Sequence, residues 1–130
     1  MSSVLIEKLT TQHGYPLVDT ANVDAFLAEP GDRVLFLTGD PDKLDDSNDI
    51  AVILPELVAR FQGRLLPAVV SRSAEDAMME RFGVEVRPTL VFLRDAEVVG
   101  RIPRVRDWDD YIARIRGILD SADGAGRTRH

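Results

Sequence analysis

The 130-residue sequence contains no cysteine, and this absence excludes several kinds of chemistry at once. Without a thiol the chain can form no disulfide, no thiolate nucleophile and no thiolate metal site. Its two histidines, His13 and His130, have no partner pair of carboxylate and nucleophile close by in the sequence. These absences predict a protein that is not an enzyme and that carries neither a cofactor nor a bound metal.

Positive charge and long apolar runs are also scarce. The 16 Lys and Arg residues stand against 22 Asp and Glu, for a net charge of −6. This balance argues against nucleic acid as the main partner and favours a basic one. No apolar run approaches the roughly 20 residues that span a bilayer, and Met1–Leu9 lacks the composition of a secretory signal. The sequence therefore predicts a cytoplasmic protein that is not embedded in a membrane.

The composition that is present is typical of a globular domain. Hydrophobic residues make up 45% of the chain and charged residues 29%. A chain of this length suits one domain with its own core. We predict a single domain over residues 1–119, followed by a polar, flexible tail over residues 120–130.

Three continuous apolar runs, Val34–Thr38, Leu65–Val70 and Thr89–Leu93, predict buried strands. Amphipathic spacing and turn residues predict the other elements: an N-terminal helix over 4–11, an edge strand over 16–19, a helix carrying Val23, Phe26 and Leu27, helices ending near Phe61 and Phe82, a strand over 97–102 and a final helix from Asp107 to Leu119. Strands joined through helices are parallel, with right-handed crossovers. The order predicts an α/β fold, with a mixed sheet covered by helices on both faces.

Local signals refine this outline. Ser47, Asn48 or Asp49 is predicted to cap the helix that ends near Phe61, and Ser73 the helix that follows. The pair Met78-Met79 and Trp108 are predicted to lie in the core.

The stretch Arg81–Leu93 carries the most specific signal. Gly83 is placed as the residue that ends a helix with a positive φ. Pro88 stands at the entrance to a strand, where its missing N–H breaks no ladder bond. A cis peptide at Arg87–Pro88 would turn the chain sharply and leave backbone exposed beside it.

The run Phe82-Gly83-Val84, then Pro88-Thr89-Leu90-Val91-Phe92, a hairpin and a terminal helix resembles the thioredoxin fold from about Pro16 to Leu119. The resemblance implies a three-layer α/β/α domain with a central mixed sheet, an extra N-terminal helix and a cis Pro88. In that family a redox dithiol follows the strand matched here by Val34–Thr38. The loop over residues 39–48 has no cysteine, and Phe36 replaces the buried aspartate of the redox members. Thiol–disulfide exchange is therefore excluded.

A narrower resemblance rests on Gly39-Asp40-Pro41, on Asp45–Asp49 leading into Ile53–Leu57, and on Arg81–Val84. These segments are similar to the HyaE/HupG hydrogenase-expression proteins, which are cysteine-free and thioredoxin-like. The resemblance implies an assembly chaperone for an uptake NiFe hydrogenase. Such a chaperone would bind the small-subunit precursor, including its twin-arginine signal peptide, before export. Other hydrogenase assembly proteins are further candidate partners.

The acidic loop and the cis-proline turn supply the candidate peptide-binding residues. Arginine pairs with carboxylates in bidentate fashion, so clustered aspartates suit a twin-arginine ligand. The candidates are Asp40, Asp42, Asp45, Asp46, Asp49, Glu56, Arg87 and Pro88. Exposed ion pairs contribute only about 0–1 kcal/mol each, so tight binding of a peptide also requires an apolar groove near Pro88. The alternative to a docking surface is a solvated loop, in which the aspartates only stabilise the N-terminus of the following helix.

Further alternatives concern the same residues. In the thioredoxin family the residue before the cis proline pairs with extended peptides, a role that falls here on Arg87 and requires an acidic-loop residue to neutralise it. The spacing Asp45-x-Ser47-x-Asp49 with Glu56 echoes a calcium loop, but Ile50 stands where that loop needs glycine. A structural or protein-interaction module, homodimeric and without signal-peptide binding, is the remaining alternative.

Overall fold

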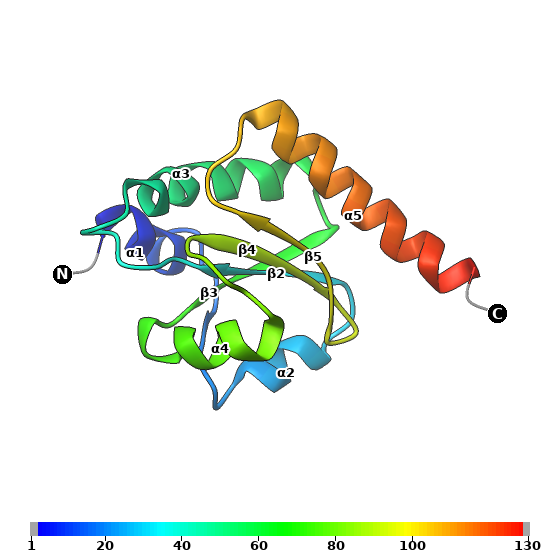
Figure 1. Ribbon diagram of the computed structural model, residues 1–130, viewed down its shortest axis with the longest axis horizontal. Helices are drawn as coiled ribbons and strands as arrows, with labels where there is room; N and C mark the ends of the chain where they lie inside the picture. The colour runs from blue at the N-terminus through cyan, green and yellow to red at the C-terminus, as the bar shows by residue number, and fades with distance from the viewer. Residues whose placement is uncertain (1–2, 129–130) are drawn as a thin grey trace.

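Five strands form one mixed sheet through the middle of the molecule (Figure 1). The computed structural model describes the backbone of residues 3–128 and the side chains of residues 3–120. The order across the sheet is β1 (Leu17–Val18), β3 (Leu65–Val70), β2 (Asp32–Leu37), β4 (Thr89–Arg94) and β5 (Glu97–Pro103). β1, β3 and β2 run parallel, whereas β4 is antiparallel to β2 and β5 to β4. The mixed sheet confirms the predicted thioredoxin-like fold. The prediction that strands joined through helices are parallel is wrong for β4, which follows β3 through α4 but runs in the opposite direction.

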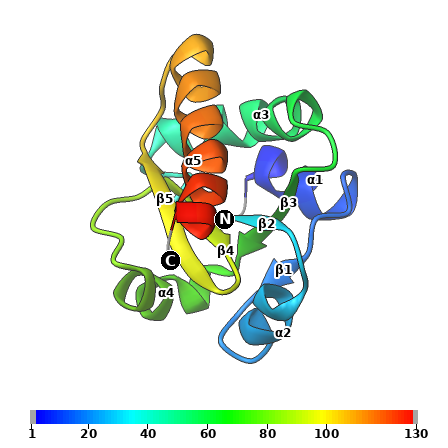
Figure 2. The same ribbon diagram turned by 90° about the vertical axis from the view of Figure 1, so that its right-hand side faces the viewer.

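Helices cover both faces of the sheet, which makes three layers (Figures 1 and 2). One face carries α1 (Val4–Thr11), α3 (Asp45–Arg60) and α5 (Trp108–Thr128). The other carries α2 (Val23–Ala28) and α4 (Glu75–Phe82), with the short 3-10 helix η1 (Arg72–Ala74) leading into α4. Within the part of the chain that the structure describes, no helix is long and apolar enough to cross a membrane.

The central strand β2 divides its side chains between two cores. Val34 and Phe36 pack with α1, α3 and α5, whereas Leu35 and Leu37 pack with α2 and α4. Alternation along a strand explains this division, because successive side chains point to opposite faces. Phe36 is fully buried in the first of these cores. Burial of a phenylalanine contributes about 1.5–3 kcal/mol, so this position supports the fold and offers no proton acceptor.

The starts of two helices differ from the prediction. α3 begins at Asp45 after Leu44, so Ser47, Asn48 and Asp49 lie inside the helix instead of capping it. The Ser47 hydroxyl donates to the backbone carbonyl of Thr38, a tertiary contact that takes the place of a cap. Ser73 lies within η1, and α4 begins two residues later.

Trp108 was predicted to be buried, but its side chain is 41% exposed. The buried positions of α5 recur every four residues, at Tyr111, Ile115 and Leu119. Trp108 is the first residue of that helix, one turn before the buried series begins. Met78 is buried as predicted, and Met79 is partly buried.

The end of the chain is helical for longer than predicted. α5 continues beyond Leu119 to Thr128, while residues 129–130, including His130, lie outside the described part. A domain boundary at residue 119 with a flexible tail after it stays a prediction.

Candidate functional site

The turn before β4 contains a cis peptide at Arg87–Pro88, which confirms the prediction. Gly83 ends α4 with a φ of 67°, also as predicted. Pro88 itself is buried, and its carbonyl accepts a hydrogen bond from the backbone N–H of Arg104 at 2.8 Å. The Arg104 carbonyl in turn accepts from the Tyr111 hydroxyl at 3.1 Å. The backbone of Arg104 thus pairs with the turn, while the Arg87 side chain is 33% exposed.

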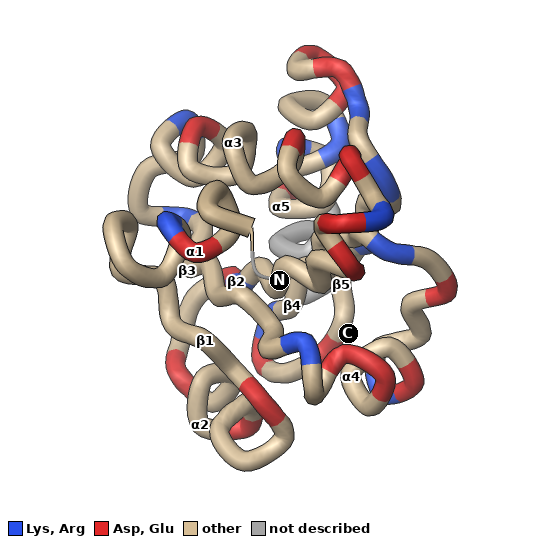
Figure 3. Tube along the Cα trace, turned by 90° about the vertical axis from the view of Figure 1, so that its left-hand side faces the viewer, with Lys and Arg blue, Asp and Glu red and all other residues tan. Residues whose placement is uncertain are grey.

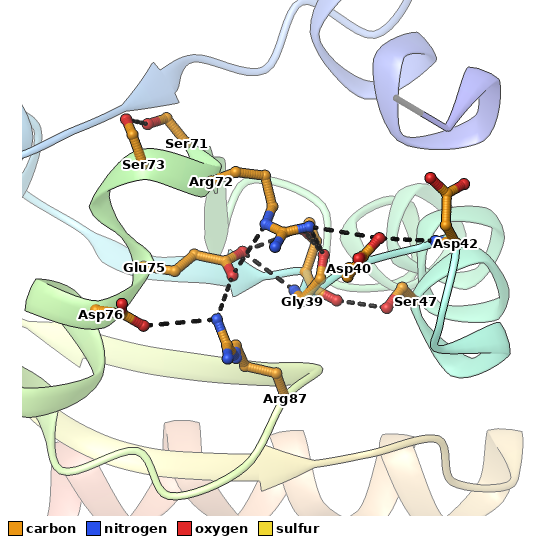
Figure 4. A network of polar contacts seen from close by, with 11 residues as sticks. Gly39, Asp40, Asp42, Ser47, Ser71, Arg72, Ser73, Glu75, Asp76 and Arg87 are labelled. Carbon is orange, nitrogen blue, oxygen red and sulfur yellow. Dashed lines mark hydrogen bonds and ion pairs between the residues drawn. The ribbon is translucent and has the colours of Figure 1, made fainter. Parts of the chain in front are cut away.

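A buried carboxylate, that of Glu75, lies behind this turn (Figure 4). One of its oxygens accepts from the Thr38 hydroxyl and from the Gly39 N–H, both at 3.1 Å. The other accepts from Arg87 Nη1 at 3.1 Å and lies 3.4 Å from Arg72 Nε. A single side chain therefore joins the end of β2, η1 and the cis-proline turn.

Two arginines compensate the charge of Glu75. An isolated buried carboxylate would cost several kcal/mol, so a fully buried glutamate needs such partners. The side chain of Arg87 is 33% exposed and also lies 3.7 Å from Asp76, while that of Arg72 is 50% exposed and lies 3.9 Å from Asp40. The acidic partners of Arg87 thus come from α4, and not from the acidic loop as the sequence suggests.

Gly39 starts the segment over residues 39–44, which is the part of the acidic loop that precedes α3, and any other residue would be strained there. Its φ is 72°, in the left-handed region that favours glycine. A Cβ at this position would lie 2.7 Å from Leu44 Cδ1 and 3.1 Å from Arg87 Cβ. The loop is therefore held tightly against the cis-proline turn.

The candidate acids fall into two groups. Asp40 and Asp42 belong to the loop, where an Asp40 carboxylate oxygen accepts from the Asp42 N–H at 3.0 Å. The others, Asp45, Asp46, Asp49 and Glu56, lie on α3. At 1.5 Å per residue, Glu56 is roughly 16 Å along the helix from Asp45, so it does not join the loop acids.

Acidic positions are spread over this view of the molecule, near α1, α2, α3 and α4 (Figure 3). The segment whose spacing echoes a calcium loop, residues 45–56, is a continuous helix and cannot wrap around an ion. Among the described residues, no group of three or more His, Asp or Glu side chains could hold a metal ion.

A pocket of about 330 Å³ opens at the acidic loop. It is lined by Ser3, Ile6, Thr38, Asp40, Pro41, Asp42 and Arg72. It combines two carboxylates with apolar surface from Ile6 and Pro41. A second pocket, of about 350 Å³, lies beside the cis-proline turn and is lined by Gly83, Val84, Glu85, Val86, Thr89, Arg101 and Pro103. The two pockets share no lining residue.

Two contributors to the site, Glu75 and the α1 residue Ile6, are not marked as functional by the sequence. Glu75 reads as a favourable acid in a first helical turn. A signal was nevertheless available, because Glu75, Met78 and Phe82 follow the i, i+3, i+7 spacing of a buried helix face, and all three are buried. No local pattern places Ile6 beside the loop.

Comparisons with known proteins identify the family of this chain. Residues 5–111 match the family described as Hydrogenase-1 expression protein HyaE. The chain is 45% identical over 123 residues to the hydrogenase expression/formation protein HupG of Rhizobium leguminosarum bv. viciae, which covers 92% of this chain and 83% of that protein. It is 44% identical over 117 residues to HoxO, the hydrogenase expression/formation protein of Cupriavidus necator, which covers 88% and 73% respectively.

A solved structure extends the match to three dimensions. A crystal structure described as that of a hydrogenase expression/formation protein hupG, from Rhodopseudomonas palustris, is 41% identical to this chain with a TM-score of 0.59. The match covers 83% of this chain and 97% of that one. The resemblance predicted from sequence is thereby confirmed, and the chain belongs to the HyaE family of hydrogenase expression proteins.

Proposed function

We propose that this chain is a non-catalytic assembly chaperone for a hydrogenase, and that it binds the small-subunit precursor with its twin-arginine signal peptide. Because the chaperone would bind the precursor before export, we propose that it acts in the cytoplasm. One observation carries the proposal. The chain belongs to a hydrogenase expression family. At the position where thioredoxin-like redox proteins carry their dithiol, it has a pocket lined by Asp40, Asp42 and apolar surface.

The carboxylates of this pocket suit a guanidinium ligand. Asp40 lies 3.9 Å from the guanidinium of Arg72, which shows that its carboxylate can face an arginine. Arginine presents a planar fork of donors that matches a carboxylate, which a lysine ammonium does not. The pocket should therefore favour an arginine pair over a lysine pair.

Charge alone is too weak to hold a peptide here. A dissociation constant of 100 µM corresponds to about −5.5 kcal/mol, and two exposed ion pairs supply at most about 2 kcal/mol. The remaining ~3.5 kcal/mol requires roughly 140 Å² of buried apolar surface, before the entropy of association is counted. The apolar run of a signal peptide can provide that area.

The test is a titration with a twin-arginine signal peptide and with its lysine–lysine counterpart, each at low and at moderate salt. The arginine peptide should bind more tightly than about 100 µM, the lysine peptide more weakly, and added salt should weaken both. If neither peptide binds within that limit, signal-peptide binding is wrong.

Charge variants then locate the contact. Asp40→Asn combined with Asp42→Asn should weaken binding of the arginine peptide. A matched control is Glu29→Gln with Glu97→Gln, which removes the same net charge from two exposed positions at the opposite end of the sheet. An equal loss of affinity in both double variants would mean that only net charge matters, which contradicts a specific site.

The alternative of an interaction module has one observation in its favour. Val4 and Leu5 on α1 are 67% and 38% exposed. A homodimer that buries them should be detected by sedimentation velocity. If the chain dimerises through this face and binds no signal peptide, the alternative replaces the proposal.

A further inference from the structure

The pocket at the acidic loop continues along α1 into a second hollow of about 230 Å³. Three residues, Ile6, Thr38 and Arg72, line both, so the two hollows are contiguous. The second hollow is lined by Ile6, Glu7, Thr10, Leu17, Thr38, Val69, Val70, Ser71 and Arg72. We call the combined feature the α1 groove. One wall is α1, and the other consists of the ends of β1 and β3 with η1.

The α1 groove changes character along its length. Asp40 and Asp42 lie at one end. Leu17, Val69 and Val70 lie at the other. Leu17 is 54% exposed, whereas its neighbour Val18 points to the opposite face of the sheet and is buried. The apolar end of the groove therefore presents a large aliphatic side chain that packing in the core does not use.

Arg72 lies between the two ends, yet it does not make the groove basic. Its guanidinium donates to the carbonyl of Gly39 at 2.9 Å and lies 3.4 Å from the buried Glu75 carboxylate (Figure 4). These contacts direct its charge toward the loop backbone and the protein interior. Asp40, Asp42 and Glu7 leave the lining with an excess of negative charge.

The pocket at the cis-proline turn has a different balance. Its lining contains one acidic residue, Glu85, and one basic residue, Arg101, which donates to the Phe82 carbonyl at 2.8 Å. It therefore has no excess of negative charge. A peptide that joins a basic segment to an apolar one complements the α1 groove and not this pocket.

We propose that the α1 groove, and not the cis-proline edge, is the binding site for the signal peptide. The basic segment lies at Asp40 and Asp42, and the apolar segment extends along α1 toward Leu17. This inference rests on the proposed function and names the surface that performs it.

The absence of cysteine permits a direct test by site-specific cross-linking. Glu7→Cys places a thiol in the α1 groove, and Glu85→Cys places one in the cis-proline pocket. Both glutamates are exposed, so the two variants lose the same charge at little cost in folding. The probe is a twin-arginine signal peptide with a single cysteine in its apolar segment, under mild oxidation.

Glu7→Cys should form the mixed disulfide at least about five-fold faster than Glu85→Cys, because bound peptide raises the local thiol concentration only in the occupied groove. Equal rates, or a faster reaction at Glu85→Cys, would overturn the α1 groove as the binding site. Circular dichroism of both variants verifies that they are folded.

Affinity measurements provide an independent readout. Leu17→Glu should weaken peptide binding by about ten-fold or more, since it places a charge against the apolar segment. Leu66→Glu is the matched control, because Leu66 is 39% exposed on β3 but does not line the groove. If the wild type binds the peptide and both variants bind it equally well, the α1 groove is not the binding site, although the proposal of signal-peptide binding stands. If wild type does not bind, both proposals fail.

Discussion

Replacement of the buried Glu75 tests the account of how the site is held together. Glu75→Gln keeps the shape of the side chain but removes its charge. The carboxylate accepts two hydrogen bonds from Thr38 and Gly39 and faces Arg87 and Arg72 on its other oxygen. An amide has one acceptor oxygen, so its NH₂ must face donors on one of these two sides.

The expected loss can be estimated from these contacts. Hydrogen bonds to charged groups contribute about 1.5–3 kcal/mol each, and breaking a buried pair costs about 3–5 kcal/mol. Both arginines are partly exposed and can turn toward water. We therefore expect Glu75→Gln to lower the free energy of unfolding by about 3 kcal/mol, the lower end of the range for a broken buried pair. This is a large fraction of the roughly 5–15 kcal/mol that stabilises such a domain.

Urea denaturation at neutral pH measures the effect. With a slope of about 1.5 kcal/mol/M, the midpoint should fall by about 2 M. Asp76→Asn is the matched control, since Asp76 is the next residue of α4 and its side chain is 96% exposed. A midpoint for Glu75→Gln that equals that of Asp76→Asn would refute the structural role assigned to Glu75.

Three further predictions concern stability. Burial raises the pKa of Tyr111 above its ordinary value of 10.0, so the unfolded state loses this proton first, and the free energy of unfolding should fall as the pH rises through about 10. Tyr111→Phe should flatten that fall in urea titrations, and an unchanged slope would contradict it. In Gly100→Ala the new Cβ would lie 2.6 Å from Ile118 Cδ1 and Cγ1, so overpacking should cost about 1–3 kcal/mol by thermal unfolding; a midpoint equal to that of wild type would count against this close approach. Asp32→Asn removes a bidentate pair with Arg94, at 2.7 and 2.9 Å, and should cost about 1–3 kcal/mol in urea; no loss would mean that the pair contributes nothing net.

The positions of the core strands and the cis-proline turn were predictable because their signals are local, whereas the order and direction of the strands in the sheet depend on tertiary contacts. Apolar runs mark β2, β3 and β4, and the proline that enters β4 follows a helix that ends at Gly83. Helix starts were less predictable, because tertiary contacts decide them. Ser47 is a good capping residue by type, but its hydroxyl bonds to Thr38 from within α3. The exposure of Trp108 was also not predictable from the local sequence, because it depends on where α5 meets the sheet.

The candidate site was predictable only in part. The aspartates of the loop were recognised from composition, since they stand together in the sequence. The α1 groove could not be recognised that way, because Ile6, Leu17 and Asp40 come from three distant segments that only the fold brings together. For Glu75, burial could be predicted from its helical spacing with Met78 and Phe82, but its hydrogen-bonding partners could not.

The most direct test of peptide binding in the α1 groove is a titration of the ¹⁵N-labelled chain with an unlabelled twin-arginine signal peptide, followed by NMR. The account predicts that the largest amide shift changes occur over residues 6–10, at Leu17, at Asp40 and at Asp42, and that they saturate with the peptide. Changes confined to residues 83–89 and Arg101 would place the peptide at the cis-proline pocket. The absence of any saturable change would contradict signal-peptide binding itself.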